Sequence, residues 1–356
     1  MRHWPLPDLI IAGAGPAGLA TALYAAQAGL QVVVVDPRVA PTDTSIHGHV
    51  HEPIDKACGE GLMPGAVRAL EALGVELPGA PIRGIRYLDG NRHAQALFRG
   101  DPGRGVRRTE LHTALRHRAV AAGVCIVRGS VSQISQDDDA VHAAGLTARY
   151  LVAADGLHSP IRRALHLDVV SPRRHARWGL RQHYAITPWT DLVEVHWSPT
   201  AEAYVTPVSA DMIGVAVLSG QRVGFAEQLT AFPDLAARLP PTAASTVRGA
   251  GPLRQRSRTR VLGRVLLVGD AAGYVDALTG EGIAVALKSA HALVGCLLAD
   301  RPQDYERDWA NATRNYRAIT TALLWAGRRR TLRPAIVPIA SALPPVFRAA
   351  VHQLAR

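Results

Sequence analysis

The sequence predicts an α/β fold, in which a discontinuous parallel-sheet domain carries an inserted antiparallel β-sheet domain and is followed by C-terminal helices. The run from Asp8 to Asp36 reads as strand, helix and strand. Two later apolar strands end at Asp155 and at Asp270, and short alternating strands lie between them. We therefore expect residues 1–80, 100–169 and 255–300 to form the first domain, residues 81–99 and 170–254 the second, and residues 301–356 a helical segment.

The opening run carries a dinucleotide fingerprint. A strand at Leu9–Ala12 leads into Gly13-Ala14-Gly15-Pro16-Ala17-Gly18, a helix follows, and a second strand at Gln31–Val35 ends on Asp36. In this Rossmann-like pattern Gly13 permits a tight turn, Gly15 lets the backbone approach a pyrophosphate, and Gly18 lets helix and sheet pack closely. The helix N-terminus offers unpaired N–H groups to phosphates, and Asp36 would accept hydrogen bonds from a ribose.

Composition narrows the function classes. Lys and Arg exceed Asp and Glu by 40 − 29 = 11, so we expect a basic surface suited to anionic cofactors or membranes. The sequence has no basic run interleaved with aromatic residues, which disfavours nucleic acid as a partner. Residues 9–35 are uncharged and long enough to span a bilayer, but their glycines and two β-branched runs favour strand, helix and strand. The chain enters its first strand without a signal peptide, so a cytoplasmic protein is expected.

No metal site is predicted. Cys58, Cys125 and Cys296 are too far apart in sequence for a zinc or disulfide framework. His47, His49 and His51 alternate in a polar loop, but no carboxylate or cysteine stands at matching spacing, so a solvated loop is favoured over a chelating one.

Further strands and helices follow in order. We expect a helix at Gly65–Leu73, a hairpin turning at Asp89-Gly90-Asn91, a helix opening at Arg107-Arg108, and strands at Cys125–Val127, Val131–Ile134, Ala140–Ala143, Tyr150–Ala154 and Arg264–Val268. The last two strands run into Asp155-Gly156 and Gly269-Asp270, and α/β proteins hold ligands at such strand ends. Gly280-Glu281-Gly282 then opens a helix at Ile283–Leu298.

The inserted and C-terminal parts have their own patterns. Alternating strands are expected at Gly179–Ile186, Val193–Trp197, Ala203–Val208 and Met212–Leu218, where an antiparallel sheet either covers a pocket or contributes only to a core. A long helix ending near Gly327 places Trp309, Ala312, Tyr316, Ile319 and Leu323 on one face. Residues 334–356 fit either a helix lying on a membrane surface or one packed over the second domain.

Four separated pieces together resemble a known family. The glycine fingerprint, the Arg108-x-x-Leu111 helix, the Asp155-Gly156 junction and the Gly269-Asp270 segment occur in the order of single-component FAD enzymes. Over about residues 8 to 300 the chain resembles the para-hydroxybenzoate hydroxylase and geranylgeranyl reductase superfamily. A second glycine fingerprint after a strand is absent, so NAD(P)H is expected only as a transient electron donor.

The resemblance implies a role for each matching residue. Gly13, Gly15, Pro16, Ala17 and Gly18 would meet the FAD pyrophosphate, and Asp36 the adenosine ribose. Arg108 would reach the pyrophosphate or the flavin, Asp155 and Gly156 would touch the FAD and NAD(P)H pyrophosphates, and Gly269 and Asp270 would hold the ribityl chain. Val131 is added to the same cofactor-binding set. Gly280, Gly282 and Ile283 would direct a helix N-terminus at the flavin, where it stabilises the negative charge of the reduced ring.

The branch of the superfamily decides the reaction. Lys56-x-Cys58-Gly59-Glu60-Gly61-Leu62-Met63-Pro64 resembles bacterial FAD-dependent monooxygenases, so hydroxylation of an aromatic or phenolic substrate is favoured. Cys58, Arg181, His183 and Tyr204, with Tyr184, are the candidate catalytic residues, each as readily structural. The segments Leu278-Thr279-Gly280-Glu281-Gly282-Ile283 and Cys58-Gly59-Glu60-Gly61-Leu62 look more like the reductase branch, which reduces double bonds of a prenyl chain. The Tyr-x-Trp-x-Phe-Pro strand expected in that branch is replaced by Tyr204-Val205-Thr206-Pro207-Val208.

Two readings from other classes are also considered. A non-catalytic carrier built on the same fold is disfavoured because the glycines of every cofactor motif are intact. A simple NAD dehydrogenase is disfavoured because it gives the Asp155-Gly156 and Gly269-Asp270 pieces no task. Among partners, an aromatic or isoprenoid small molecule is expected, and the basic C-terminal region is a candidate for peripheral contact with the inner face of the membrane.

Overall fold

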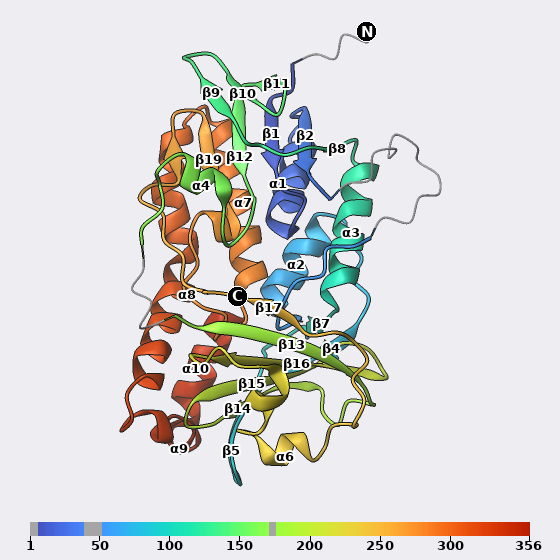
Figure 1. Cartoon of the computed structure of the whole chain (residues 1–356), viewed down its shortest axis with the longest axis vertical. Coiled ribbons are helices and arrows are strands. Elements are labelled where there is room, and N and C mark those ends of the chain that lie inside the picture. Colours follow the sequence, from blue (N-terminus) through green and yellow to red (C-terminus); the bar gives the residue numbers. More distant parts are fainter. Residues whose placement is uncertain (1–5, 39–51, 171–175) are drawn as a thin grey trace.

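The computed structural model describes residues 6–38, 52–170 and 176–356, and all elements named below lie in these ranges. The molecule is elongated, with one sheet and its helices at one end and a larger sheet at the other (Figure 1). The long helix α8, Tyr305–Gly327, runs along one side and spans both ends. The two sheets are therefore separate layers that loops and C-terminal helices join.

The first sheet is built from short apolar strands in the order β18-β19-β12-β1-β2-β8. β1, Leu9–Ala12, pairs in parallel with β2 and with β12, and it is buried throughout, as expected of a strand covered on both faces. The other strands are β2 (Val32–Asp36), β8 (Cys125–Arg128), β12 (Tyr150–Ala153), β18 (Val261–Leu262) and β19 (Val265–Leu267). These strands come from distant segments of the chain, so the sheet is discontinuous in sequence, and the domain bounds given above stay a prediction.

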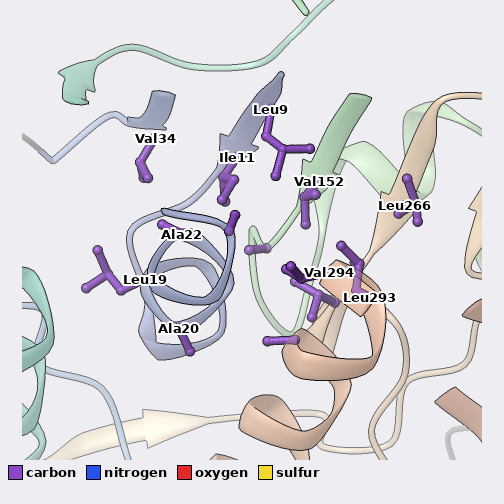
Figure 2. Close-up of a cluster of buried hydrophobic side chains, with 14 of the residues drawn as sticks. Leu9, Ile11, Leu19, Ala20, Ala22, Val34, Val152, Leu266, Leu293 and Val294 are labelled. Carbon is purple, nitrogen blue, oxygen red and sulfur yellow. The ribbon is translucent and has the colours of Figure 1, made fainter. Parts of the chain in front are cut away.

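Helices α1, Pro16–Gln27, and α7, Gly282–Leu298, lie side by side against this sheet. Figure 2 shows their apolar side chains filling the space beside β1, β12 and β19. A Cβ on Gly18 would lie 1.9 Å from the carbonyl oxygen of Gly13, so only glycine lets α1 approach the turn this closely. Helices α2, Pro64–Ala72, and α3, Arg108–Ala121, complete the layer.

The second sheet has the strand order β17-β13-β16-β15-β14-β5-β6. Its members are β5 (Gly84–Asp89), β6 (Arg92–Leu97), β13 (Trp178–Ala185), β14 (Leu192–Trp197), β15 (Ala201–Pro207), β16 (Met212–Ser219) and β17 (Arg248–Ala250). The predicted β5–β6 hairpin turns at Gly90, whose φ of 57° favours glycine. The sheet is antiparallel except where β5 pairs in parallel with β14. Helices α5, Phe225–Leu229, and α6, Pro233–Ala236, cover its outer face.

Two small sheets and a short helix complete the cofactor side. Their strands are β3 (Gly61–Leu62), β7 (Gly103–Gly105) and β4 (Ala80–Ile82) in one sheet, and β9 (Ile134–Gln136), β10 (Val141–Ala143) and β11 (Leu146–Ala148) in the other. The predicted strand at Val131–Ile134 is wrong, because pairing with β10 begins only at Ile134. Helix α4, Pro160–Ala164, follows β12, and the Ser159 side chain accepts a hydrogen bond from the Arg162 N–H at 2.9 Å.

The C-terminal segment folds over the second sheet as α8, α9 (Ile336–Ala342) and α10 (Pro344–Leu354), and both α9 and α10 contact β6. The buried face of α8 includes Thr313, Thr320 and Leu324 rather than the predicted Ala312, Ile319 and Leu323, which are only half-buried. The Thr313 and Thr320 hydroxyls are satisfied by the Trp309 carbonyl and by Thr279, so both threonines tolerate the core.

No single helix among the described residues is long and apolar enough to cross a membrane. Residues Arg333–Ala342 and Pro344–Leu354 pass the length and composition test only together, with a bend of 102° between them.

Arg333 fastens the C-terminal helices to the second sheet. Its guanidinium donates to the carbonyl oxygens of Ser198 at 2.6 Å and Ala201 at 2.7 Å, and it pairs with buried Glu202 at 2.7 Å. It also donates to the Gly327 carbonyl at the end of α8, at 3.0 Å. One buried side chain thus joins α8, the α8–α9 connection and β15.

We predict that Arg333→Ala lowers the free energy of unfolding by about 2–4 kcal/mol, because it leaves several buried acceptors unpaired. Thermal unfolding of the FAD-saturated protein measures the loss. Arg330→Ala, at an exposed position three residues earlier, is the matched control and should stay within about 0.5 kcal/mol of the parent protein. Equal melting temperatures for the two variants would contradict this role.

Candidate cofactor and substrate site

One continuous cavity of about 720 Å³ lies between the two sheets. The β1–α1 turn, the loop at residues 54–63, the ends of β12 and β19, and the α7 N-terminus form one part of its wall. The inner face of the second sheet and α8, α9 and α10 form the rest. The predicted residues that line it are Gly15, Pro16, Ala17, Cys58, Arg108, Asp155, Gly156, Arg181, Tyr204, Asp270, Gly280, Gly282 and Ile283.

The glycines of the β1–α1 turn have different surroundings. No described atom lies within 4 Å of the place a Cβ would occupy on Gly15, so the backbone there is open to a ligand. Gly13, with φ of 109°, instead packs on Ala154, where a Cβ would meet the carbonyl oxygen at 2.5 Å. The α1 N-terminus has no side-chain cap, which leaves its N–H groups to a phosphate. His112 of α3 steadies this turn, since its Nε2 lies 3.0 Å from the Ala14 carbonyl oxygen.

Asp36 is engaged by the protein itself. Its Oδ2 accepts the Ala14 N–H at 2.8 Å and pairs with Arg38 at 2.7 Å. Burial alone would raise the pKa of Asp36, but the hydrogen bonds from Arg38 and Ala14 outweigh it and hold the pKa below its usual value. Arg38 lines the cavity whereas Asp36 and Val131 do not, so the ribose contact of Asp36 and the cofactor contact of Val131 stay predictions.

Three cations converge on the cofactor part of the cavity: Arg38, Lys56 and Arg108. Burial, reinforced by the positive charges of Arg38 and Arg108, lowers the pKa of Lys56. Arg108 is buried, and its Nε has no hydrogen-bond partner in the part of the chain that the structure describes. The Lys56 ammonium lies 3.5 Å from the Cβ position of Gly156. Clustered cations with unused donors fit an anionic group such as a pyrophosphate.

Two carboxylates face these cations from the ends of β12 and β19. Burial raises the pKa values of both Asp155 and Asp270. Asp155 accepts the Ile161 N–H at 3.0 Å, and its other oxygen has no partner among the residues described. Such acceptors fit the hydroxyl groups of a sugar or ribityl chain. Gly269, with φ of 62°, lies against Ala17 of α1 rather than on the cavity wall.

Arg162 is a structural residue that the sequence analysis missed. Its buried guanidinium donates to the carbonyls of Ala271 at 2.8 Å and Leu157 at 3.0 Å, and to the Gln255 side chain at 3.0 Å. It therefore braces the two strand-end loops that carry Asp155 and Asp270. The signal was available, because Asp155-Gly156 continues to Ser159 and Arg162, but only its first two residues were used.

The N-terminus of α7 closes the cofactor part with Gly280, Gly282 and Ile283. Between the glycines, Glu281 is buried, and its Oε2 has no partner in the described ranges. Burial raises the pKa of Glu281 to about 7, against the opposing charge of Lys288. Tyr274, also missed, lines the cavity with its hydroxyl 3.6 Å from the Cβ position of Gly282, and burial raises its pKa well above the usual value.

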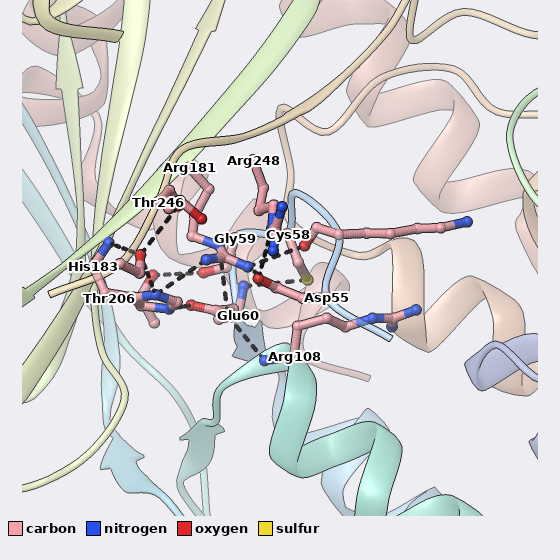
Figure 3. A network of polar contacts seen from close by, with 12 residues as sticks. Asp55, Cys58, Gly59, Glu60, Arg108, Arg181, His183, Thr206, Thr246 and Arg248 are labelled. Atoms are coloured by element: carbon pink, nitrogen blue, oxygen red, sulfur yellow. Dashed lines mark hydrogen bonds and ion pairs between the residues drawn. The ribbon is translucent and has the colours of Figure 1, made fainter. Parts of the chain in front are cut away.

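The loop from Asp55 to Gly61 is held by the polar network of Figure 3. Glu60 accepts the Arg108 N–H at 2.9 Å, and its other oxygen lies 2.7 Å from Nε2 of His183. Arg181 pairs with Asp55, lies 3.8 Å from Glu60 and donates to Nδ1 of His183 at 3.1 Å. Arg181 and His183 thus position the loop, and His183 does not line the cavity.

Of the remaining catalytic candidates, two line the cavity and one lies on the opposite face of the second sheet. Cys58 lines the cavity, its sulfur accepts the Glu60 N–H at 3.4 Å, and burial raises its pKa, so it is a thiol at neutral pH. Tyr204 also lines the cavity and donates to the Leu278 carbonyl at 2.6 Å. Tyr184 lies on the opposite face of the sheet in a core with Phe225 and Phe232, so its proposed substrate contact is wrong.

Beyond Tyr204 the wall becomes apolar. The Tyr87 ring packs there against Phe347, with ring centroids 4.9 Å apart. On Trp197 it packs with ring centroids 5.6 Å apart. Of the described residues from α8, α9 and α10 that line the cavity, none is charged. They include Ile319, Leu323, Ile336, Ile339, Leu343, Val346, Phe347, Val351 and Leu354.

Within the ranges described, no group of three or more His, Cys, Asp or Glu side chains is arranged to hold a metal ion. His47, His49 and His51 lie outside the described residues.

A family model described as "FAD binding domain" matches residues 7–301, the stretch that holds the glycine turn, both strand-end aspartates and the α7 N-terminus. The chain belongs to this FAD-binding family. It is an oxidoreductase with FAD as its cofactor, and the cations and open glycine of the cavity fit that group. The resemblance drawn from the sequence motifs is thereby confirmed.

Individual proteins are similar over most of the chain. Menaquinone reductase of Mycobacterium tuberculosis is 29% identical over 340 residues, covering 85% of this chain and 78% of its own. Protein CbrA of Escherichia coli is 28% identical, with 89% and 87% covered. Among solved structures, a flavoprotein/dehydrogenase from Cytophaga hutchinsonii has a TM-score of 0.80 at 18% identity, with 98% and 92% covered. Halogenase PltM in complex with phloroglucinol and FAD has a TM-score of 0.74 at 16% identity, with 97% and 85% covered, so these two show the fold alone.

We predict that Lys56→Gln weakens FAD binding about tenfold to a hundredfold, because it removes a cation that lines the cavity at the pyrophosphate end. Titration of apoprotein with FAD, followed by flavin fluorescence, gives the dissociation constant. The chain has one other lysine, Lys288, which is exposed on α7, and Lys288→Gln is the control. Equal affinities for the two variants would remove Lys56 from the cofactor site.

Glu281 predicts a pH dependence of stability. Its pKa is raised to about 7 in the fold from the usual 4.5, so the folded state keeps a proton that the unfolded chain loses between these values. The free energy of unfolding therefore falls as pH rises from about 4.5 to about 7. Glu281→Gln should remove this pH-dependent contribution to the free energy of unfolding. The difference in the free energy of unfolding between the variant and the parent protein should therefore shift in favour of the variant by about 3 kcal/mol between pH 4 and pH 8. Melting curves of the FAD-saturated proteins at both pH values test it, and a difference independent of pH would contradict it.

Proposed function

We propose that the protein is an FAD-dependent reductase that saturates a carbon–carbon double bond in a long apolar substrate of prenyl type, with NAD(P)H as the transient hydride donor. The uncharged wall contributed by α8, α9 and α10 is the observation that carries the proposal. A wall without charged groups favours a hydrocarbon chain over a phenol that must be polarised. The name of the menaquinone reductase relative, a protein that acts on a quinone, supports this substrate class.

The sequence favoured hydroxylation over reduction of a double bond, and the positions of the candidate residues favour reduction instead. Hydroxylation of a phenol needs a side chain that polarises its oxygen, and of the four candidates from the second sheet Tyr184 lies on the opposite face. Arg181 and His183 are engaged with Asp55 and Glu60, and the Tyr204 hydroxyl donates to the Leu278 carbonyl. These side chains contribute to holding the protein together, so hydride transfer to a chain is the better supported reaction.

Saturation of a double bond adds a hydride to one carbon and a proton to the other. Bound FAD supplies the hydride chemistry. The protein must supply the proton. The Cys58 thiol and the Tyr274 phenol both line the cavity, and they keep their protons at neutral pH because burial raises their pKa values. The apolar wall keeps water from the reacting carbons, and the Glu60 network fixes the loop that carries Cys58.

Hydroxylation of an aromatic or polyketide-like substrate is the second candidate. The motif from Lys56 to Pro64 resembles that of bacterial monooxygenases, and the fold is shared with a halogenase that binds phloroglucinol. A non-catalytic carrier is less well supported, because a carrier has no need for the paired cations and carboxylates at the cofactor end.

The deciding experiment incubates the FAD-loaded protein and NAD(P)H with menaquinone as the probe, with and without oxygen, and follows the product by mass spectrometry. A reductase of this type yields, without oxygen, a product that gains two hydrogens in its prenyl chain, and it keeps them when the quinone ring is reoxidised in air before mass spectrometry. A product that carries an atom from labelled O₂ overturns the proposal in favour of hydroxylation.

We further predict that Cys58→Ala slows anaerobic turnover at least tenfold while FAD binding stays unchanged, because a proton donor in the cavity is lost. Cys125→Ala, a half-buried cysteine in β8 away from the cavity, is the matched control. Unchanged turnover in Cys58→Ala assigns the proton to another donor, and the same measurement on Tyr274→Phe then tests the phenol.

A further inference from the structure

The C-terminal helices expose large apolar side chains at the end of the molecule that carries the second sheet. We define the C-terminal apolar patch as Leu97 of β6, Trp325 of α8, Ile339 of α9, and Leu343 and Val346 at the α9–α10 corner. Their exposed fractions run from 50% for Leu343 to 63% for Val346. Because α9 and α10 both contact β6, and α10 also contacts α8, the strand and these helices form one surface.

The cavity reaches this patch. Ile339, Leu343 and Val346 line the cavity and are at the same time at least half exposed, so the cavity meets the surface between them. The corner itself, residues 341–346, is exposed throughout and carries no charge. An apolar ligand leaving the cavity at this point therefore passes only apolar or uncharged side chains.

The charge around the patch has one sign. Residues 309–356 contain eight arginines and no aspartate or glutamate. Arg329 and Arg330, just beyond α8, and Arg348, on α10, are exposed and lie within five residues of Trp325 or Val346 in the sequence, and the Arg329 guanidinium lies 4.4 Å from the centre of the Trp325 ring. Aliphatic side chains, a tryptophan and arginines gathered on one surface are the composition of an interfacial membrane-binding element. The arginines complement anionic headgroups.

We propose that the C-terminal apolar patch docks on an anionic lipid bilayer, with its apolar side chains at the boundary between headgroups and acyl chains and its arginines on lipid phosphates. The docking goes beyond the flavin chemistry and does not depend on it. Use of the cavity mouth as the entrance for a membrane-dissolved substrate rests on the proposed function. The α9–α10 pair lies on the surface rather than spanning, because α10 packs through Phe347, Val351 and Leu354 into the interior.

Flotation of the FAD-loaded full chain with vesicles tests the docking. Vesicles of phosphatidylcholine with 30% phosphatidylglycerol, about a third anionic lipid, match the charge that the arginines require. We expect the protein to float with these vesicles and to bind pure phosphatidylcholine vesicles at least tenfold more weakly, with binding to the anionic vesicles weakened by salt. Absence of binding to the anionic vesicles overturns the proposal.

Matched variants locate the surface. Leu343→Asp with Val346→Asp should weaken vesicle binding at least tenfold, whereas Val120→Asp with Val170→Asp, at exposed valines outside the patch, should not. Arg329→Glu with Arg330→Glu should weaken binding to a similar extent, and the charge-matched pair Arg163→Glu with Arg222→Glu should not. FAD absorbance confirms that each variant is folded. If vesicle binding falls equally in the target pairs and in the control pairs, binding depends on the net charge or the overall apolarity of the protein. That result overturns the assignment to the patch.

A second copy of this chain is the competing occupant. Sedimentation of the parent protein and of Leu343→Asp with Val346→Asp, without lipid, separates the two: a dimer that the variant loses, with no vesicle binding by the parent protein, overturns the proposal. A monomer that binds vesicles supports it. Because vesicle binding is measured without turnover, its failure leaves the reductase assay on detergent-dispersed menaquinone as an independent test of the proposed function.

Discussion

The site depends on the carboxylate of Glu60. This residue adopts a φ of 61°, a left-handed conformation that costs a non-glycine residue about 1–2 kcal/mol. Its oxygens bind the Arg108 N–H of α3 and His183 of β13, so one side chain joins the loop, the cofactor domain and the second sheet. Cys58 and Lys56 stand on the same loop. Their places in the cavity therefore follow from the network around Glu60, and the backbone strain is offset by these charge-assisted hydrogen bonds.

The cavity separates charge from hydrocarbon. The cations and carboxylates of the wall lie at the turn, on the loop, at the strand ends, at the start of α3 and, as Arg181, in β13, whereas the wall from α8 to α10 is uncharged. A charged side chain in the apolar part would bear a large desolvation cost, and an apolar wall at the cofactor end would leave phosphates without partners. Each ligand is thus recognised by the part of the wall whose polarity it matches, and the two parts meet near Cys58, Tyr274 and Tyr204.

Local patterns predicted the cofactor end well, because a strand, a glycine turn and a helix N-terminus are determined by neighbouring residues. The strand ends at Asp155 and Asp270 were likewise readable. The partners of buried polar groups were not, because they come from distant segments: Asp36 bonds the turn and Arg38, and Arg181 is used by Asp55. The burial of Thr313 and Thr320 on α8 was not predicted for the same reason, since a hydroxyl that finds a hydrogen-bond partner can be buried.

The cofactor end is arranged in a way that FAD itself completes. Lys56 has a lowered pKa from burial and neighbouring cations, and Asp270 a raised pKa from burial, so each charge is disfavoured in the protein alone. A pyrophosphate beside the cations and hydroxyl donors beside the carboxylate reverse both effects. Binding and folding are therefore coupled, by about 2.7 kcal/mol when FAD is a hundredfold above its dissociation constant. The apolar end needs no such ligand, because Arg333 and the packing of α10 hold its helices in place from within the chain.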